Sequence, residues 1–205
     1  MHTPYPWLRA WPLCACLLLA SALLWLQPAR ELSAGLIGIT YLALCLHYCW
    51  PPRRTAQAGE LLVAYASQGG QAQRLAERSC AQLLTSGMPA RCIALNQLGS
   101  AQLASLERLL LVVSTYGDGE APDNAARFER ALQSLPALPQ LRFAILALGD
   151  SGYPQFCAFG QRLQQRLQTL KAQPLFDLLS VDCLDAGTLR HWQQQLGHLS
   201  CNSDF

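Results

Sequence analysis

Three short, almost purely apolar runs constrain this chain more than any other feature of its sequence. They are LLVAYA at residues 61–66, LLLVVS at 109–114 and RFAILAL at 142–148. Segments with the apolar spacing of a helix lie between and after them. Strands that lack polar alternation are buried on both faces, as in a parallel sheet covered by helices. The pattern therefore predicts a doubly wound α/β domain with right-handed crossovers.

The complete expected order alternates five strands with five helices. The strands are expected at residues 61–66, 91–95, 109–114, 142–148 and 174–179, and the helices at 71–85, 100–106, 122–135, 155–170 and 185–199. Gly87 is expected to end the first helix. Ser100 and Asp185 are expected to cap the second helix and the last. The sequence thus predicts a five-stranded parallel sheet.

Three glycine-bearing segments follow three of these strands, and each precedes a helix. They are SQGGQA at residues 67–72, STYGDGE at 114–120 and LGDSGY at 148–153. Because the loops at the carboxyl ends of parallel strands meet at one edge of the sheet, they predict a ligand crevice there. A simple turn explains each segment taken alone, whereas three in this order favour a binding site.

The first segment has the properties of a phosphate site. It leads into a helix, whose first backbone N–H groups and positive dipole end favour an anion. Gly69 and Gly70 let the backbone approach closely. Ser67 and Gln68 add polar side chains. The segment has no lysine and is not a Walker A loop. The other two segments each bring a tyrosine and an acidic residue, which suits a flat, aromatic, phosphorylated ligand.

The second and third segments resemble a known family over longer stretches. STYGDGEAPDNA at residues 114–125 and ALGDSGYPQFCAFG at 147–160 are similar to the FMN-binding, flavodoxin-like domain of diflavin reductases. That family includes the flavoprotein of bacterial sulfite reductase and the NADPH–haemoprotein reductases. The resemblance covers about residues 60–200 and implies a flavodoxin-like fold with FMN. The family typically has S-Q-T-G-T-A at the phosphate loop, whereas this chain has Gly69 and Gln71 in place of the two threonines.

The resemblance implies a role for each segment. The first would hold the FMN phosphate, and Tyr116 and Tyr153 would flank the isoalloxazine ring. The expected FMN-binding residues are Ser67, Gln68, Gly69, Gly70, Gln71, Ala72, Ser114, Thr115, Tyr116, Gly117, Leu148, Gly149, Asp150, Tyr153, Phe156, Cys157 and Asp182. No catalytic side chain and no metal ligand are expected. Aromatic stacking and nearby negative charge would make the fully reduced flavin a strong one-electron donor.

The N-terminal region is much more apolar than the rest. Uncharged runs at residues 11–26 and 32–50 approach or reach the length of a membrane-spanning helix. Aromatic residues lie at the ends of both runs, as they do at membrane interfaces. We therefore expect two transmembrane helices, at about residues 8–26 and 32–50. A signal peptide is the alternative interpretation of the first run.

Basic residues predict how this hairpin is oriented. Arg9 precedes the first run, and Arg53 and Arg54 follow the second. The positive-inside rule then puts both ends in the cytoplasm. The expected organisation is a membrane hairpin and linker at residues 1–56 and a flavodoxin-like domain at 57–205. This domain would face the cytoplasm from the inner membrane.

Charge and cysteine content exclude some other classes of protein. From Gly59 onward the chain has 11 Lys and Arg against 12 Asp and Glu and no basic stripe, so nucleic-acid binding has little support. The nine cysteines are irregularly spaced and contain no C-x-x-C pair, which argues against a zinc site. Reduced thiols are expected, as is usual in the cytoplasm.

The expected function is single-electron transfer by a membrane-anchored FMN protein. No second dinucleotide-binding fingerprint follows, so electrons would come from a separate FAD- and NAD(P)H-dependent reductase, unless the chain is a truncated relative. They would pass to a redox acceptor such as a haem protein, with membrane lipid as a further partner. Acidic residues at positions 118, 120, 123 and 150 would favour a basic partner. Two alternatives are a self-contained flavin-dependent quinone or ferric reductase and a flavin-free interaction module.

Overall fold

The structure is a computed structural model that describes residue 37, residues 39–42 and residues 60–201. The chain divides into two units, Met1–Arg54 and Thr55–Phe205. Residue 37 and residues 39–42 are helical. Within the described ranges, no helix is both long and apolar enough to cross a membrane. The expected helix at 8–26, most of that at 32–50 and the boundary at residue 57 lie outside these ranges and stay predictions.

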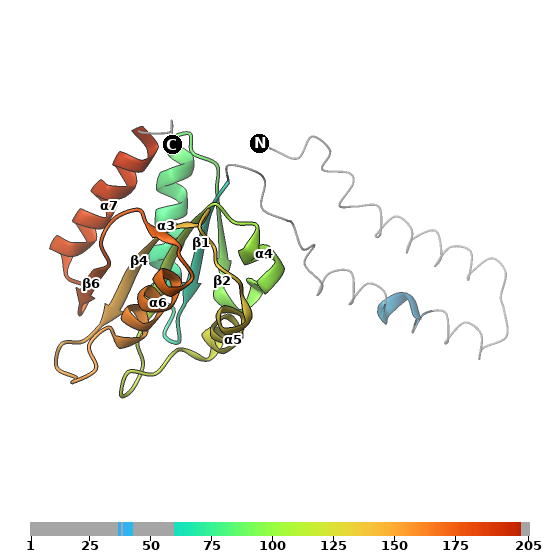
Figure 1. The fold of residues 1–205 in the computed structure, drawn as a ribbon, viewed down its shortest axis with the longest axis horizontal. Helices are drawn as coiled ribbons and strands as arrows, with labels where there is room; N and C mark the ends of the chain where they lie inside the picture. The colour runs from blue at the N-terminus through green and yellow to red at the C-terminus, as the bar shows by residue number, and fades with distance from the viewer. Residues whose placement is uncertain (1–36, 38, 43–59, 202–205) are drawn as a thin grey trace. The chain divides into compact units, whose positions relative to one another are not determined.

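A parallel sheet forms the centre of the second unit (Figure 1). Its strands are β1 (Leu61–Ala66), β2 (Ala90–Ala94), β3 (Arg108–Ser114), β4 (Arg142–Gly149), β5 (Gln173–Pro174) and β6 (Leu179–Asp182). The order is β2-β1-β3-β4-β5, and β6 also pairs with β4. Every strand pair is parallel. The predicted parallel α/β architecture is therefore confirmed.

Helices cover both faces of this sheet (Figure 1). They are α3 (Gln71–Thr85), η2 (Leu95–Gln97), α4 (Ser100–Ala104), η3 (Asp123–Ala125), α5 (Ala126–Ser134), α6 (Ala158–Thr169) and α7 (Ala186–Cys201). Helices α3 and α7 share one hydrophobic core with the sheet, and α4, α5 and α6 share the other. The sheet is thus doubly wound.

Burial on both faces explains why the central strands carry almost no polar side chains. In β1, Leu62 and Ala64 pack into the core beneath α4, α5 and α6. Leu61 and Val63 point to the other face, beneath α3 and α7. All four residues are at most 1% exposed. Because successive side chains point to opposite faces, a strand covered on both sides must be apolar at every position.

The fifth strand differs from the prediction of one run at residues 174–179. Phe143 of β4 pairs with Pro174, and Leu146 pairs with Leu179. The six residues from Pro174 to Leu179 therefore span the same length of sheet as the four residues from Phe143 to Leu146 of β4. The extra residues cannot stay paired, so the predicted strand is divided into β5 and β6. Within the break, Phe176 packs edge-on against Trp192 of α7, with ring centroids 5.5 Å apart. Tertiary packing of this aromatic pair accompanies the interruption.

Several helix boundaries also differ from the prediction. Helix α6 begins at Ala158 rather than at residue 155, because Cys157 has a left-handed φ of 53° that interrupts the helix. The helix expected from residue 122 starts as η3 and becomes α-helical at Ala126. Ser100 is the first residue of α4 rather than its cap. Asp185 does cap α7, since its Oδ2 accepts a 2.7 Å hydrogen bond from the Thr188 N–H.

Helices α3 and α6 end in the same kind of turn but use different residues for it. After α3, Gly87 has φ +81°, its N–H donates to the Leu84 carbonyl, and the next N–H donates to the Leu83 carbonyl. This is a Schellman motif, which confirms Gly87 as the predicted terminator. After α6, Lys171 adopts φ +65° in the same hydrogen-bond pattern. A side chain in this conformation is strained.

Replacing Lys171 with glycine is expected to stabilise the protein. The exposed side chain makes the left-handed conformation costly, and glycine removes that cost, so we expect the free energy of unfolding to rise by about 0.5–1 kcal/mol. Urea unfolding measures the change. Gly87→Ala is the matched control: no atom lies within 4 Å of its Cβ position, so backbone strain alone should lower stability. A Lys171→Gly variant no more stable than the parent would contradict the assignment.

The five cysteines within residues 60–201 are free: Cys80, Cys92, Cys157, Cys183 and Cys201. Burial, and secondarily the nearby Cys80 thiol, raise the pKa of Cys92 to about 12. Burial also raises the pKa of Cys157. These two thiols are therefore protonated at neutral pH and are poor nucleophiles.

Candidate functional site

A cavity of about 670 Å³ lies at the carboxyl ends of β3 and β4. It is lined by Gln71, Ser114, Thr115, Tyr116, Gly117, Leu148, Gly149, Asp150, Tyr153, Gln155, Phe156, Cys157, Cys183 and Leu184. All three glycine-bearing segments contribute to this lining, as the sequence predicted. A second cavity, of about 400 Å³, lies near the amino ends of the strands and contains none of the predicted site residues.

The first segment places an open helix end beside this cavity. Gly70 precedes α3 in a left-handed conformation, with φ +77°. No side chain caps the helix, and its first turn has no acidic residue. Its initial N–H groups are therefore free to bind an anion. Gln71, the first residue of α3, reaches the cavity lining.

Two hydroxyl groups in these segments are buried without a partner. Ser67 Oγ and Thr115 Oγ1 have no hydrogen-bond partner, although water does not reach either atom. Buried polar atoms are nearly always hydrogen-bonded in folded proteins. Ser67 is in the phosphate-type segment, and Thr115 lines the cavity. The two orphaned hydroxyls therefore indicate a polar ligand.

The second segment forms a closed backbone turn. The Tyr116 N–H donates to the Glu120 carbonyl at 3.0 Å, and the Glu120 N–H donates to the Tyr116 carbonyl at 2.7 Å. The Thr115 N–H donates to the Leu148 carbonyl and ties the segment to the end of β4. Gly117 and Gly119 both have positive φ, at 49° and 91°. The turn thus has a backbone shape that favours glycine at two positions.

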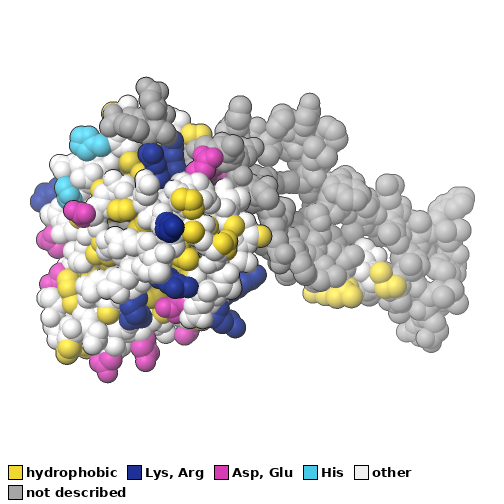
Figure 2. Space-filling model, in the orientation of Figure 1, with side chains coloured by type: hydrophobic (Ala, Val, Ile, Leu, Met, Phe, Trp, Pro, Cys, Tyr) yellow, Lys and Arg dark blue, Asp and Glu magenta, His cyan; other side chains and the backbone are white. Residues whose placement is uncertain are grey.

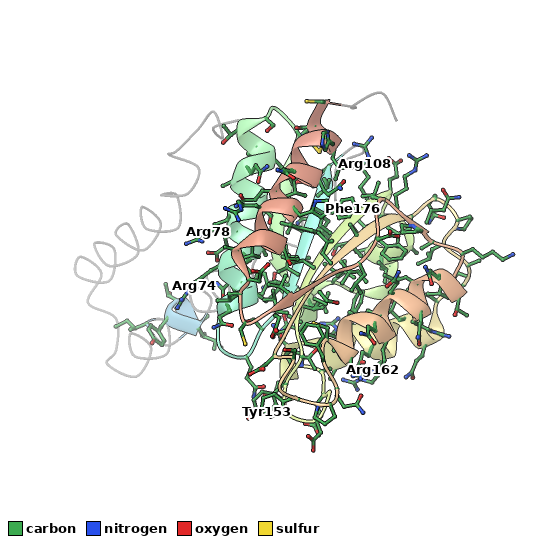
Figure 3. The ribbon with its side chains drawn as sticks, turned by 90° about the vertical axis from the view of Figure 1, so that its left-hand side faces the viewer. Arg74, Arg78, Arg108, Tyr153, Arg162 and Phe176 are labelled. Carbon is green, nitrogen blue, oxygen red and sulfur yellow. The ribbon has the colours of Figure 1, made fainter. Side chains whose placement is uncertain are left out.

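Two exposed tyrosines lie on the rim of the cavity. Tyr116 is 54% exposed and Tyr153 is 56% exposed, and both line the cavity. Figure 3 shows Tyr153 at the loop edge of the domain. Large aromatic side chains are costly to leave in water. Their position on two segments that line one cavity suits a flat ligand stacked on an aromatic ring.

Asp182 supports the third segment and is absent from the cavity lining. Its Oδ1 accepts a 2.8 Å hydrogen bond from the Ser151 N–H, and its Oδ2 accepts a 2.5 Å bond from the Ser151 hydroxyl. Gly152 and Tyr153 each donate a backbone N–H to Asp150. The structure therefore shows Asp182 holding Ser151 of this segment in place, and its expected contact with FMN stays a prediction.

The hydrogen bonds from Ser151 hold the pKa of Asp182 below its ordinary value of 3.8. A lowered carboxyl pKa means that this contact favours the folded loop at pH values above 3.8. The contribution is lost as the pH falls through the lower, folded-state pKa. At neutral pH the loop therefore keeps this anchor in full.

Ser151→Ala is expected to raise the Asp182 pKa toward 3.8, because it removes the hydroxyl donor. The carboxyl titration can be followed by NMR. Asp185 is the internal control, since its pKa is lowered by bonds from Thr188, which the substitution leaves in place. An Asp182 titration that does not move in the variant would contradict the role given to Ser151.

Three lining residues were missed from the sequence: Gln155, Cys183 and Leu184. Cys183 and Leu184 directly follow β6 and have left-handed φ values of 44° and 61°. The sequence placed the end of the fifth strand at residue 179, so these two residues did not fall at a strand end. The true end, Asp182, would have identified them. Gln155 lies two residues beyond Tyr153 and lacked any glycine or aromatic signal.

A family model described as flavodoxin matches residues 63–192. The chain belongs to the flavodoxin family. FMN is the cofactor of that family, so membership of the family confirms the cofactor predicted from the sequence. The fold and the electron-carrier class predicted from the sequence agree with it.

Two curated relatives show which flavodoxin-type domains the chain is similar to. The sulfite reductase [NADPH] flavoprotein alpha-component of Bacillus subtilis is 42% identical over 130 residues, which are 62% of this chain and 21% of the relative. The protein of the same name from Vibrio cholerae is 34% identical over 144 residues, or 69% and 24%. The chain therefore spans about a quarter of these relatives or less.

Solved flavodoxin structures share the fold at lower identity. A Streptococcus pneumoniae TIGR4 flavodoxin gives a TM-score of 0.63 at 19% identity, covering 69% of this chain and 98% of that one. Oxidised flavodoxin 1 of Bacillus cereus gives 0.63 at 20% identity, covering 70% and 98%. Both solved flavodoxins are covered almost completely by this chain.

Proposed function

We propose that this chain binds FMN in the cavity at the carboxyl ends of β3 and β4 and carries single electrons between separate proteins. One observation supports this most. The unpartnered Ser67 and Thr115 hydroxyls lie in two segments of one site that also has an uncapped helix end. A phosphorylated ligand with polar ring edges would satisfy all of these groups.

The residues present fit both parts of FMN. The phosphate would be held by Ser67, the backbone at Gly69 and Gly70, and the first N–H groups of α3. The isoalloxazine ring would lie between Tyr116 and Tyr153, with Thr115 at its edge. When bound, FMN supplies one-electron and two-electron redox chemistry. The protein supplies position and electrostatics.

Charge around the site supports a role as an electron donor. Asp150 lines the cavity, and no lysine or arginine is among the residues that line this cavity. Asp118, Glu120 and Asp123 are exposed on the neighbouring loop. Figure 2 shows acidic side chains along the lower edge of the domain, where the loops at the carboxyl ends of the strands lie in Figure 1. Negative charge here disfavours extra negative charge on a bound flavin and favours a basic docking partner.

The proposed partners follow from the relatives and from the acidic loops. The relatives are named as flavoprotein components of an NADPH-dependent sulfite reductase, and this chain matches only a part of them. We therefore propose a separate FAD- and NAD(P)H-dependent reductase as the electron source and a redox protein, such as a haem protein, as the acceptor. The membrane hairpin and its inner-membrane, cytoplasm-facing orientation are part of this proposal and rest on the N-terminal sequence.

Cytochrome c reduction by the full chain, loaded with FMN, tests the carrier role. With NADPH and a separate FAD-containing reductase, we expect reduction that requires both proteins. Reduction by the chain and NADPH alone would instead favour the self-contained reductase. No reduction under either condition, with FMN bound, would count against electron transfer. Leu84→Ala, at an exposed position on α3, is a control expected to behave as the parent.

A further inference from the structure

We propose that Arg162 is a positioning residue that fixes the Tyr116 loop (residues 115–120). This loop is one wall of the cavity at the carboxyl ends of β3 and β4. The inference concerns the shape of the loop itself. Only its consequence for FMN rests on the function proposed above.

A direct hydrogen bond joins α6 to the tip of this loop. Arg162 Nη1 donates to the Gly119 carbonyl at 2.7 Å, in a partly buried position. The Arg162 guanidinium also lies over the Phe159 ring, 5.8 Å from its centroid. The ring contact restricts the side chain before it binds the loop, so less side-chain entropy is lost. Figure 3 shows Arg162 on α6, toward the same end of the domain as Tyr153.

Gln155 and Ala158 pack against the same loop tip at Gly119. Gly119 is buried, with φ +91°, and a Cβ there would lie 2.8 Å from Gln155 Cβ and 3.3 Å from Ala158 Cβ. Ala158 and Arg162 are four residues apart on α6 and therefore share one face of the helix. The tip of the loop thus packs against the start of α6, and Arg162 binds the tip from the next turn of the same helix.

Holding the tip also holds Tyr116. Gly119 precedes Glu120, whose backbone pairs with Tyr116 through two hydrogen bonds. At the other end, Thr115 is bonded to the end of β4. Tyr116 is 54% exposed, so backbone hydrogen bonds rather than burial hold this residue in place. Gln155 contacts the tip and lines the cavity, which couples this wall to the segment that carries Tyr153.

Arg166 provides a matched control on the same helix. Its Nη2 donates to the Leu132 and Gln133 carbonyls at 3.1 and 3.3 Å, at the end of α5. Arg166→Ala therefore removes an arginine-to-carbonyl contact of the same kind, and the same charge, without touching the Tyr116 loop. Arg162→Lys keeps the charge and a donor but loses the planar guanidinium.

The test compares Arg162→Ala, Arg162→Lys and Arg166→Ala in the full chain. Hydrogen exchange of the Tyr116 and Glu120 amides is measured without FMN, followed by FMN affinity and midpoint potential. In Arg162→Ala we expect both amides to exchange about tenfold faster and FMN to bind about tenfold more weakly, with a shifted potential. Arg162→Lys should recover part of each effect. Arg166→Ala should leave the loop, affinity and potential unchanged while lowering the melting temperature.

The outcomes separate this inference from the proposed function. Unchanged amide exchange in Arg162→Ala would overturn the inference, whatever happens to FMN. Faster exchange with unchanged FMN affinity and potential would overturn the role of the loop in FMN binding. If the parent binds no FMN but Arg162→Ala still loosens the loop, the proposed function fails and the loop assignment stands.

Discussion

Replacing both Gly69 and Gln71 with threonine is expected to tighten FMN binding about ten- to hundredfold. Each substitution adds a hydroxyl group at the uncapped start of α3, and a single hydrogen bond to a charged group contributes about 1.5–3 kcal/mol net, which is roughly ten- to hundredfold in affinity. The site has room, since no atom lies within 4 Å of a Cβ built on Gly69. Gln71 is exposed at the first helical position. The change restores the S-Q-T-G-T-A pattern of the diflavin reductases.

Titration of the full chain with FMN, followed by flavin fluorescence, measures this effect. Gly70→Thr is the matched control, because it introduces the same side chain one residue away. Gly70 has φ +77°, a conformation that a β-branched residue adopts only under strain. The control should therefore weaken FMN binding. If the double variant binds no more tightly than the parent, the phosphate does not lie at this loop.

Gly160→Ala is expected to destabilise the domain by about 2–3 kcal/mol, because the site is already filled. A Cβ built on Gly160 would lie 2.5 Å from the Cβ of Ala147. Gly160 is on α6 and Ala147 is on β4, and both residues are buried. The methyl group would therefore push the helix away from the sheet. The segment that carries Tyr153 leads into this helix, so FMN binding should weaken as well.

A double-mutant cycle identifies the cause of this loss. Ala147→Gly removes the opposing methyl group, so the pair Gly160→Ala and Ala147→Gly should be more stable than the sum of the single changes predicts. Gly197→Ala is a helical control with nothing within 4 Å of its Cβ, and it should be neutral or stabilising. Urea unfolding gives the free energies of the four proteins in the cycle and of the Gly197→Ala control. Strict additivity in the cycle would show that the two methyl groups do not meet.

The strands and helices specified by local composition were predictable from the sequence. β1 and α3 have the predicted bounds because each has one dominant pattern, an apolar run or a helical spacing. The break between β5 and β6 was not predictable, because it depends on register with β4 and on the contact between Phe176 and Trp192. Such long-range contacts leave no local signal in the chain.

The site was predictable where glycine marks it and not where other residues take unusual conformations. Gly70 and Gly117 have left-handed conformations, and these were predictable because glycine is the residue that adopts them most readily. Cys157, Cys183 and Leu184 adopt left-handed conformations with side chains that normally avoid them, so only the fold reveals their positions. Asp182 was named from the family resemblance alone, which could not show that this residue ends β6 or that its carboxylate binds Ser151.

FMN binding by the full chain tests the central claim most directly. The protein is purified without added flavin, its absorption spectrum is recorded, and FMN is then titrated while the spectrum and the released cofactor are analysed. We expect flavin absorption bands, FMN as the bound species and one site per chain, with binding lost on combined Tyr116→Ala and Tyr153→Ala substitution. A parent protein that binds no flavin at excess FMN would contradict the account and would favour a flavin-free interaction module.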